Sequence, residues 1–366
     1  MATNSGYSYS SYKKWLKRFF VIFLLLLLLT AVFNFQVDSA GVFRPNKGLK
    51  YTAVNLLKGN MVVGYPGRND ERELQRLIVE NYPGRRDIVA IGSSRTMVLR
   101  KRFIGRDIDF FNHSVAGAVI EDYVAIIGLY KRKGVLPKTV IIGLDPWMFN
   151  KNNKMGGDFW RVLESYYNEM AAQFPKSSRG TRVVGNAADE KAGVTSTYKQ
   201  LINLEYTLQN WQYLQKGKKA YVTDTIDVDD YVREPDGSLH FPYSTRFAKM
   251  PAGLALDLPE IIYSNFDAIS GTELFENLLH YLMAHGVRVV LLLPPLHPDV
   301  YRFWQQNPKY AITLKVETYL RELARANNIT VIGSFDPGRY GFRADDFADA
   351  IHGHETVMKR LFEGFR

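Results

Sequence analysis

From about residue 80 onward, short β-branched runs alternate with amphipathic stretches along the chain. The apolar runs predict strands at 87–91, 108–112, 139–144, 287–293 and 330–333. Between them, apolar residues recur at helical spacing in 121–133, 273–285 and 310–327. Strands that alternate with helices over short connections are typical of a parallel sheet with helices on both faces. We therefore expect an α/β fold, a three-layer, doubly wound parallel sheet, in a domain that spans residues 81–366.

One stretch, at about 150–257, interrupts this alternation. It is too long for a simple connection within a sheet, so we interpret it as an insertion. Its first half has a helical pattern, clearest at 198–214, and its second half places Asp236-Gly237 between extended segments, which predicts a hairpin. Such an insertion either shapes a substrate cleft or only packs on the sheet, and the sequence leaves both interpretations open. A cleft would gain sugar-stacking surface from Trp147, Trp160, Trp211 and Tyr243.

The N-terminal segment contains a long apolar run. From Phe19 to Phe33 only Thr30 is not strongly apolar, and tolerating Asn34 extends the run to Val37, close to the ~20 residues that cross a bilayer. The run is preceded by a basic cluster, Lys13, Lys14, Lys17 and Arg18. This asymmetry predicts a cytoplasmic tail at 1–18, a transmembrane anchor at 19–37, a linker and lead-in at 38–80, and an extracytoplasmic domain. The alternative is a cleaved signal peptide that leaves Ala40 as the new N-terminus, which places the domain on the same side.

Composition narrows the chemistry. The 366 residues include no cysteine, which excludes disulfides, thiolate metal sites and a cysteine nucleophile. A net charge of +10 suits nucleic acid, an anionic membrane or an acidic polymer. The basic residues are scattered among acidic ones and form no nucleic-acid-binding motif, so we expect no nucleic-acid partner. The histidines show no metal-ligand spacing, and we expect neither a metal nor another cofactor.

Three short motifs fall where the predicted strands end. Gly92-Ser93-Ser94-Arg95-Thr96 follows the first strand, and the segment from Asn112 to Gly117 follows the second. Near the C-terminus, Asp349-Ala350-Ile351-His352 places a carboxylate three residues before an imidazole, a spacing that lets the carboxylate orient a general base. Taken singly, a serine after a strand is usually a helix cap and the other two motifs are common. Together they lie at the carboxyl edge of one sheet, where open α/β folds bind ligands.

In this order the motifs resemble those of the SGNH (GDSL-like) hydrolase superfamily, across about residues 85–366 without the insertion. The resemblance implies Ser94 as the nucleophile, His352 as the general base and Asp349 as its orienting partner. It also implies that the backbone amides of Gly117 and Ser94 donate to the oxyanion, with Asn112 opening the second block.

The third block departs from the family, because Asp145 stands where members usually have an oxyanion-binding asparagine. An ionised carboxylate cannot donate, and losing one such donor costs ~10²–10³ in rate. Either another donor such as Arg95 replaces it or catalysis is weak. Asp145 is alternatively a structural cap before Pro146.

The Gly-Ser-Ser-Arg form, the anchor and the aromatic insertion resemble the branch that works beside membrane-bound O-acyltransferases, as in alginate O-acetylation and teichoic-acid D-alanylation. This resemblance implies a serine-dependent acyltransferase or esterase of the cell envelope. Its implied partners are a membrane-bound O-acyltransferase and a polysaccharide or other surface polymer. The alternative from another class is a catalytically silent domain that binds polymer or scaffolds the acyltransferase.

Overall fold

The computed structural model describes residues 9–38, 43, 47–64, 68–153, 157–175, 198–216, 220–246 and 266–365. The chain divides into two compact units. One comprises residues 1–46 and 182–219, and the other comprises 47–181 and 220–366. The second unit holds every residue of the predicted SGNH-like motifs.

The larger unit is built on a parallel sheet. Its strands are β2 (Ile88–Ile91), β3 (Phe110–Asn112), β4 (Thr139–Gly143), β8 (Arg288–Leu293) and β9 (Thr330–Gly333), in the order β3-β2-β4-β8-β9. Each neighbouring pair is parallel, with Ile88 opposite both Phe110 and Thr139. The predicted strands and the parallel sheet are thus confirmed. Strand order reverses between β2 and β4, which makes the carboxyl ends of these strands the favoured place for a ligand.

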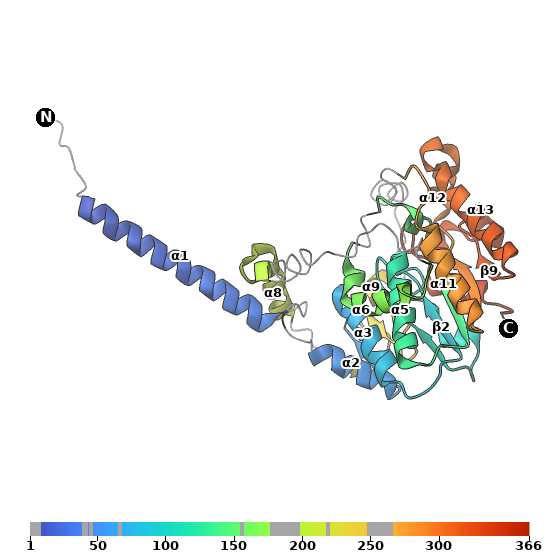
Figure 1. The fold of residues 1–366 in the computed structure, drawn as a ribbon, viewed down its shortest axis with the longest axis horizontal. Coiled ribbons are helices and arrows are strands. Elements are labelled where there is room, and N and C mark those ends of the chain that lie inside the picture. The colour runs from blue at the N-terminus through green and yellow to red at the C-terminus, as the bar shows by residue number, and fades with distance from the viewer. Residues whose placement is uncertain are drawn as a thin grey trace. The chain divides into compact units, whose positions relative to one another are not determined.

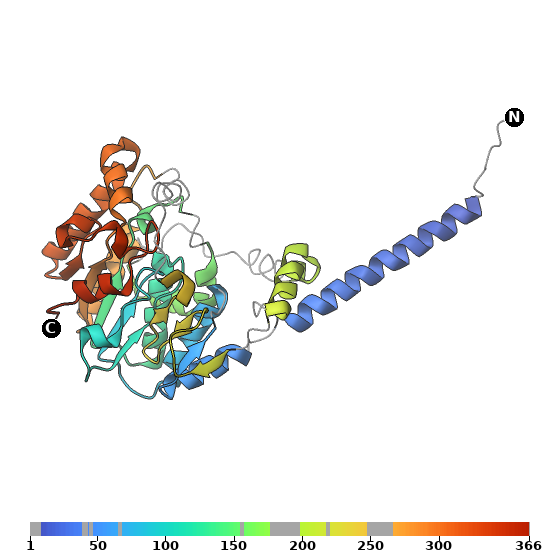
Figure 2. The same ribbon diagram turned by 180° about the vertical axis from the view of Figure 1, so that it is seen from behind.

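Helices cover both faces of this sheet (Figures 1 and 2). Alternate strand residues belong to two separate cores, so that Val89 and Ile91 face one side and Ile88 and Ala90 face the other. The first face carries α5 (Ile120–Lys133), α6 (Glu164–Ala171), α11 (Thr272–Ala284), α12 (Pro298–Gln306) and α13 (Ala311–Ala326). The second carries α4 (Lys101–Ile104) and α14 (Glu355–Leu361). Short 3₁₀ turns complete the connections: 146–149, 159–163, 308–310, 337–340 and 344–346.

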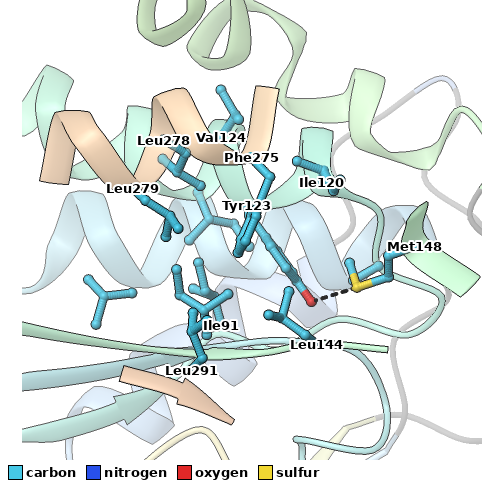
Figure 3. Close-up of a cluster of buried hydrophobic side chains, with 14 of the residues drawn as sticks. Ile91, Ile120, Tyr123, Val124, Leu144, Met148, Phe275, Leu278, Leu279 and Leu291 are labelled. Carbon is cyan, nitrogen blue, oxygen red and sulfur yellow. Dashed lines mark hydrogen bonds between the residues drawn. The ribbon is translucent and has the colours of Figure 1, made fainter. Parts of the chain in front are cut away.

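The first core is packed between α5, α11 and the strands (Figure 3). Tyr123 of α5 is fully buried there, and its hydroxyl donates to the Gly143 carbonyl and lies 3.3 Å from Met148 Sδ. A buried hydroxyl without acceptors would be costly, so these contacts fix how α5 lies on the end of β4.

The lead-in before residue 80 holds more regular structure than a linker. It forms α2 (Lys47–Leu57), β1 (Met61–Val63) and α3 (Arg68–Asn81). Strand β1 joins a second, antiparallel sheet in the order β5-β1-β6-β7, with β5 (Tyr221–Thr223), β6 (Val232–Arg233) and β7 (Leu239–His240). Strands β6 and β7 form the hairpin predicted around Asp236-Gly237, and α9 (Tyr243–Arg246) follows.

The smaller unit contains the apolar N-terminal helix α1 (Tyr9–Val37). A stretch of 26 residues in it, Tyr12–Val37, is long and apolar enough to cross a membrane, as an anchor or as a signal sequence. Within the unit, the 3₁₀ turn η4 (Gln200–Ile202) and helix α8 (Leu204–Lys216) contact α1. The alternative cleavage point before Ala40 lies outside the described residues.

Candidate active site

Ser94, His352 and Asp349 lie together in a linear chain of hydrogen bonds. Ser94 Oγ is 2.8 Å from His352 Nε2, and His352 Nδ1 is 2.7 Å from Asp349 Oδ2. Asp349 Oδ1 also accepts the backbone N–H groups of Ile351 and His352, at 2.8 Å each. These bonds close the Asp-x-x-His segment into a tight turn that holds the imidazole ring toward the serine. The arrangement can move a proton from Ser94 to His352 while Asp349 fixes the ring.

The local sequence explains why Ser94 rather than Ser93 meets the histidine. Ser93 is buried, and its hydroxyl accepts the backbone N–H of Arg95, while Ser94 is partly exposed. Gly92 is needed immediately before, because a Cβ at this position would collide with the Thr96 side chain. The turn after β2 therefore points the second serine outward.

Asp349 stays ionised in this setting. Burial of its carboxyl group would raise its pKa, but the hydrogen bond and the charge of His352, with the two backbone N–H groups, outweigh burial and lower the pKa to about 2. A carboxylate at this point favours the histidine tautomer that carries its proton on Nδ1, which leaves Nε2 as an acceptor for Ser94.

Arg95 and Asp145 form a buried ion pair directly behind the serine. Arg95 Nη1 donates to Asp145 Oδ1, Nη2 donates to the carbonyls of Pro294 and Pro295, and Nε donates to the carbonyl of Ile351. Each nitrogen of the guanidinium thus has a structural partner. The expected substitute donor, Arg95, is committed to a clamp that joins the loops after β2, β4 and β8 to the segment carrying His352.

The Asn112 side chain is committed to hydrogen bonds within the fold, whereas the Gly117 backbone amide has no such partner in the described part of the chain. The Asn112 amide donates to the carbonyls of Thr96 and Leu99, and its oxygen accepts the N–H of Ser114. Gly117 has a φ of 59°, a conformation that favours glycine. Within the described residues, the backbone N–H groups of Ser94 and Gly117 donate to no protein acceptor. Neither amide is therefore committed to a structural hydrogen bond within the described residues.

The hairpin of the insertion supplies one wall of a cleft beside His352. The cleft has a volume of about 380 Å³, and its lining includes Tyr231, Phe241, Arg246, His352 and His354. The Phe241 ring lies edge-on to the imidazole of His352, with 5.9 Å between ring centroids. Sequence reasoning missed Phe241, because it follows a two-residue strand, β7, that is too short to signal which side chain will reach the site.

A second buried arginine, Arg100, holds this wall in place. It donates to Glu355 of α14 at 2.9 Å and to Ser238 of the hairpin at 2.9 Å, and it lies 2.9 Å from His240 Nδ1. Burial lowers the pKa of His240, although its bond to Glu234 opposes that effect, so the ring is neutral and accepts from Arg100 on Nδ1. The network joins the segment after β2, the hairpin and the helix that follows His352.

Other residues singled out by sequence have structural surroundings. His297 is buried and caps α12 through its ring Nδ1. Its backbone N–H donates to the carbonyl of Ala350. Trp147 and Trp160 are also buried, at 4% and 5% exposure, so they offer no surface to a sugar. Tyr243 is exposed, and Trp211 belongs to the other unit.

Comparison with known proteins gives no assignment: no family model matches the chain, and no curated protein matches it.

Proposed function

We propose that this protein is an extracytoplasmic, serine-dependent acyl-ester enzyme, an O-acyltransferase or esterase that acts on a cell-surface or exported polymer. The observation that carries the proposal is the hydrogen-bonded series Ser94, His352 and Asp349, with bonds of 2.8 and 2.7 Å. Its position at the carboxyl edge of the sheet, next to the strand-order reversal, is where this fold class binds substrates. The motif resemblance to SGNH hydrolases supports the same chemistry.

The geometry supports the following first half-reaction. Ser94 Oγ attacks the acyl carbonyl carbon while its proton passes to His352 Nε2, and the carbonyl π electrons become an oxyanion that the N–H groups of Ser94 and Gly117 can bind. The intermediate collapses as the ester C–O bond breaks and His352 returns the proton to the leaving oxygen. Ser94 is then acylated.

The second half-reaction reverses these roles with a new acceptor. A hydroxyl of the polymer, or water, loses its proton to His352 and attacks the acyl carbon, and Ser94 leaves with the proton that His352 returns. Transfer and hydrolysis differ only in this acceptor. A cleft of about 380 Å³ next to His352 has room for a sugar hydroxyl with part of its ring.

The rate that we expect depends on the oxyanion donor that Asp145 cannot supply in place of the usual asparagine. Asp145 is neutralised by Arg95, so its carboxylate repels an oxyanion less than a lone charge would, but it supplies no hydrogen bond. We expect a slow enzyme on small activated esters, lower by about 10²–10³ than one with a complete oxyanion hole.

The apolar run of α1 and the basic residues before that run in the same helix support a single-pass anchor with the N-terminus in the cytoplasm. Such an anchor would keep the site near a membrane-bound O-acyltransferase that supplies acyl groups, and raise the effective concentration of both. The alternative function, a silent scaffold for that partner, is favoured by Asp145 at the position of the usual asparagine.

Covalent labelling tests the chemistry. The full-length protein in detergent is exposed to an activated acetyl ester, and its intact mass and modified residue are determined by mass spectrometry. We expect one acetyl group on Ser94 and none in Ser94→Ala, whereas Ser93→Ala, the matched control, remains labelled because Ser93 faces inward. No adduct under conditions that label a known serine esterase would favour the scaffold.

A further inference from the structure

The apolar helix α1 of the smaller unit carries a buried polar residue, Asn34. Asn34 has no solvent exposure, and its amide nitrogen donates to the Leu201 carbonyl at 3.0 Å and to Thr207 Oγ1 at 2.9 Å. Its oxygen accepts from the Asn210 amide at 3.0 Å. These partners belong to η4 and α8, so a segment about 170 residues away in sequence is bonded to α1 at one point.

The position of Asn34 along α1 fixes its depth if α1 spans a membrane. At 1.5 Å per residue, Asn34 lies about 24 Å beyond Arg18, the last basic residue before the apolar run, in a hydrocarbon layer of about 30 Å. It therefore lies close to the outer edge of the hydrocarbon. An amide there without partners is costly, and η4 and α8 supply those partners. Helix α8 must then lie at the same level as Asn34.

Helix α8 exposes an apolar stripe next to its contact with α1. Leu204, Leu208 and Trp211 share one side of the helix and are 71%, 54% and 55% exposed. Tyr206 and Asn210, on the side that meets α1, are buried. An exposed apolar stripe of this kind on a helix normally marks a membrane or a partner.

Two observations select lipid as the occupant. The stripe is continuous with the apolar surface of α1, because the Trp211 ring lies 6.5 Å from the ring of Phe33. Tryptophan is also enriched at the boundary between acyl chains and headgroups. A helix with an apolar side and a polar side at that boundary lies in the plane of the interface.

We propose that α8 is an interfacial helix that inserts Leu204, Leu208 and Trp211 into the outer leaflet beside α1, with Asn34 as the lock between the two helices. This proposal rests on the proposed anchoring by α1, but not on the acyl-ester chemistry. It assigns the first half of the insertion to membrane contact, while the hairpin in its second half serves the candidate active site.

The absence of cysteine allows a direct test by single labels. Leu208→Cys and the matched control Glu205→Cys, both at exposed positions of α8, are each labelled with an environment-sensitive fluorophore in the full-length protein. The proteins are reconstituted into phosphatidylcholine vesicles that contain lipids with a quencher near the headgroup. We expect several-fold stronger quenching at position 208 than at 205, because only 208 faces the lipid.

A third label, at Leu25→Cys in the middle of α1, separates this proposal from the anchoring itself. If a quencher near the acyl-chain ends reaches position 25 but positions 208 and 205 are quenched equally or not at all, α1 is inserted and the proposal for α8 is wrong. Failure at all three positions overturns the anchoring as well. A label at 208 that is shielded in native membranes but not in lipid vesicles identifies a protein partner, and this result also overturns the proposal for α8.

The role of Asn34 has its own test. Asn34→Leu, which keeps α1 apolar, should reduce quenching at 208 several-fold. Unchanged quenching would show that Asn34 does not hold α8 against α1.

Discussion

Arg95 Nη1 lies 2.7 Å from Asp145 Oδ1, and both side chains are 1% exposed. Arg95 directly follows Ser94 in the sequence, and its pair with Asp145 fixes the chain segments on which the site depends. A buried ion pair is expensive to desolvate, and it persists here because Arg95 also satisfies three backbone carbonyls. The residue that departs from the SGNH pattern is thus explained as one half of a structural clamp.

Breaking this pair should destabilise the protein strongly. Asp145→Ala should lower the free energy of unfolding by about 3–5 kcal/mol, because it leaves the Arg95 charge buried without a counter-ion. The double variant Arg95→Met, Asp145→Leu should recover only part of that loss, because it removes the unpaired charge but also the donor to three backbone carbonyls. The exposed pair of Arg161 and Glu164 is the control, and Glu164→Ala should cost less than about 1 kcal/mol. Urea unfolding in detergent measures all three, and equal costs for Asp145→Ala and Glu164→Ala would contradict the clamp.

Removing the imidazole should abolish activity without unfolding the protein. We expect His352→Ala to lower kcat/KM on an activated ester by at least roughly 10³-fold, since His352 Nε2 is the partner of Ser94 Oγ among the described residues. His280→Ala, at an exposed position of α11, should leave the rate unchanged. A rate in His352→Ala equal to that of wild type would favour the scaffold.

Asp349 should matter for orientation and for stability in acid. Asp349→Asn should lower the rate by roughly 10²–10⁴-fold, and no more than His352→Ala does, because the aspartate only positions the ring. Its pKa is lowered to about 2 in the fold, so its ionised form stabilises the protein above about pH 4, and that contribution is lost as the pH falls from about 4 to about 2. Asp349→Asn should therefore lose less stability than wild type across that window. Parallel acid-unfolding curves would contradict this ionisation.

Topology is testable with fusions. A reporter that is active only outside the cytoplasm should give signal when it is fused after residue 366, because the basic cluster before Phe19 retains the tail inside. The same reporter placed before Lys13 should be silent. Activity of a cytoplasm-only reporter at the C-terminus would overturn the proposed localisation.

The direction of acyl transfer should appear in the polymer. We expect that deleting the gene lowers the ester content of the surface polymer, and that the Ser94→Ala chain fails to restore it while Ser93→Ala succeeds. A rise in ester content on deletion would instead identify an esterase that removes the groups. Chemical release and quantification of the ester-linked acid measures both.

The sequence was sufficient where local pattern and fold geometry agree. The β-branched runs located the parallel strands to within one or two residues, and the carboxyl end of the first strand placed Ser94 at the edge of the sheet. The sequence was insufficient where contacts between distant parts of the chain determine the structure. Strand β1 has three residues and no readable period, and it forms by pairing with β5 and β6 more than 150 residues later. The partnership of Arg95 with Asp145 likewise joins residues 50 apart, and neither residue alone indicates the other.

Ser94 and His352 are separated by 258 positions, and the histidine comes after the last strand of the sheet. Contacts between such distant residues form late, once the intervening chain has folded. During synthesis Ser94 emerges long before His352, so in the nascent chain the serine lacks its proposed general base. Under the proposed chemistry, Ser94 would become reactive only after His352 has been synthesised and has reached it. A chain that stops before residue 349 would keep every strand of the parallel sheet in its sequence and still lack the reaction.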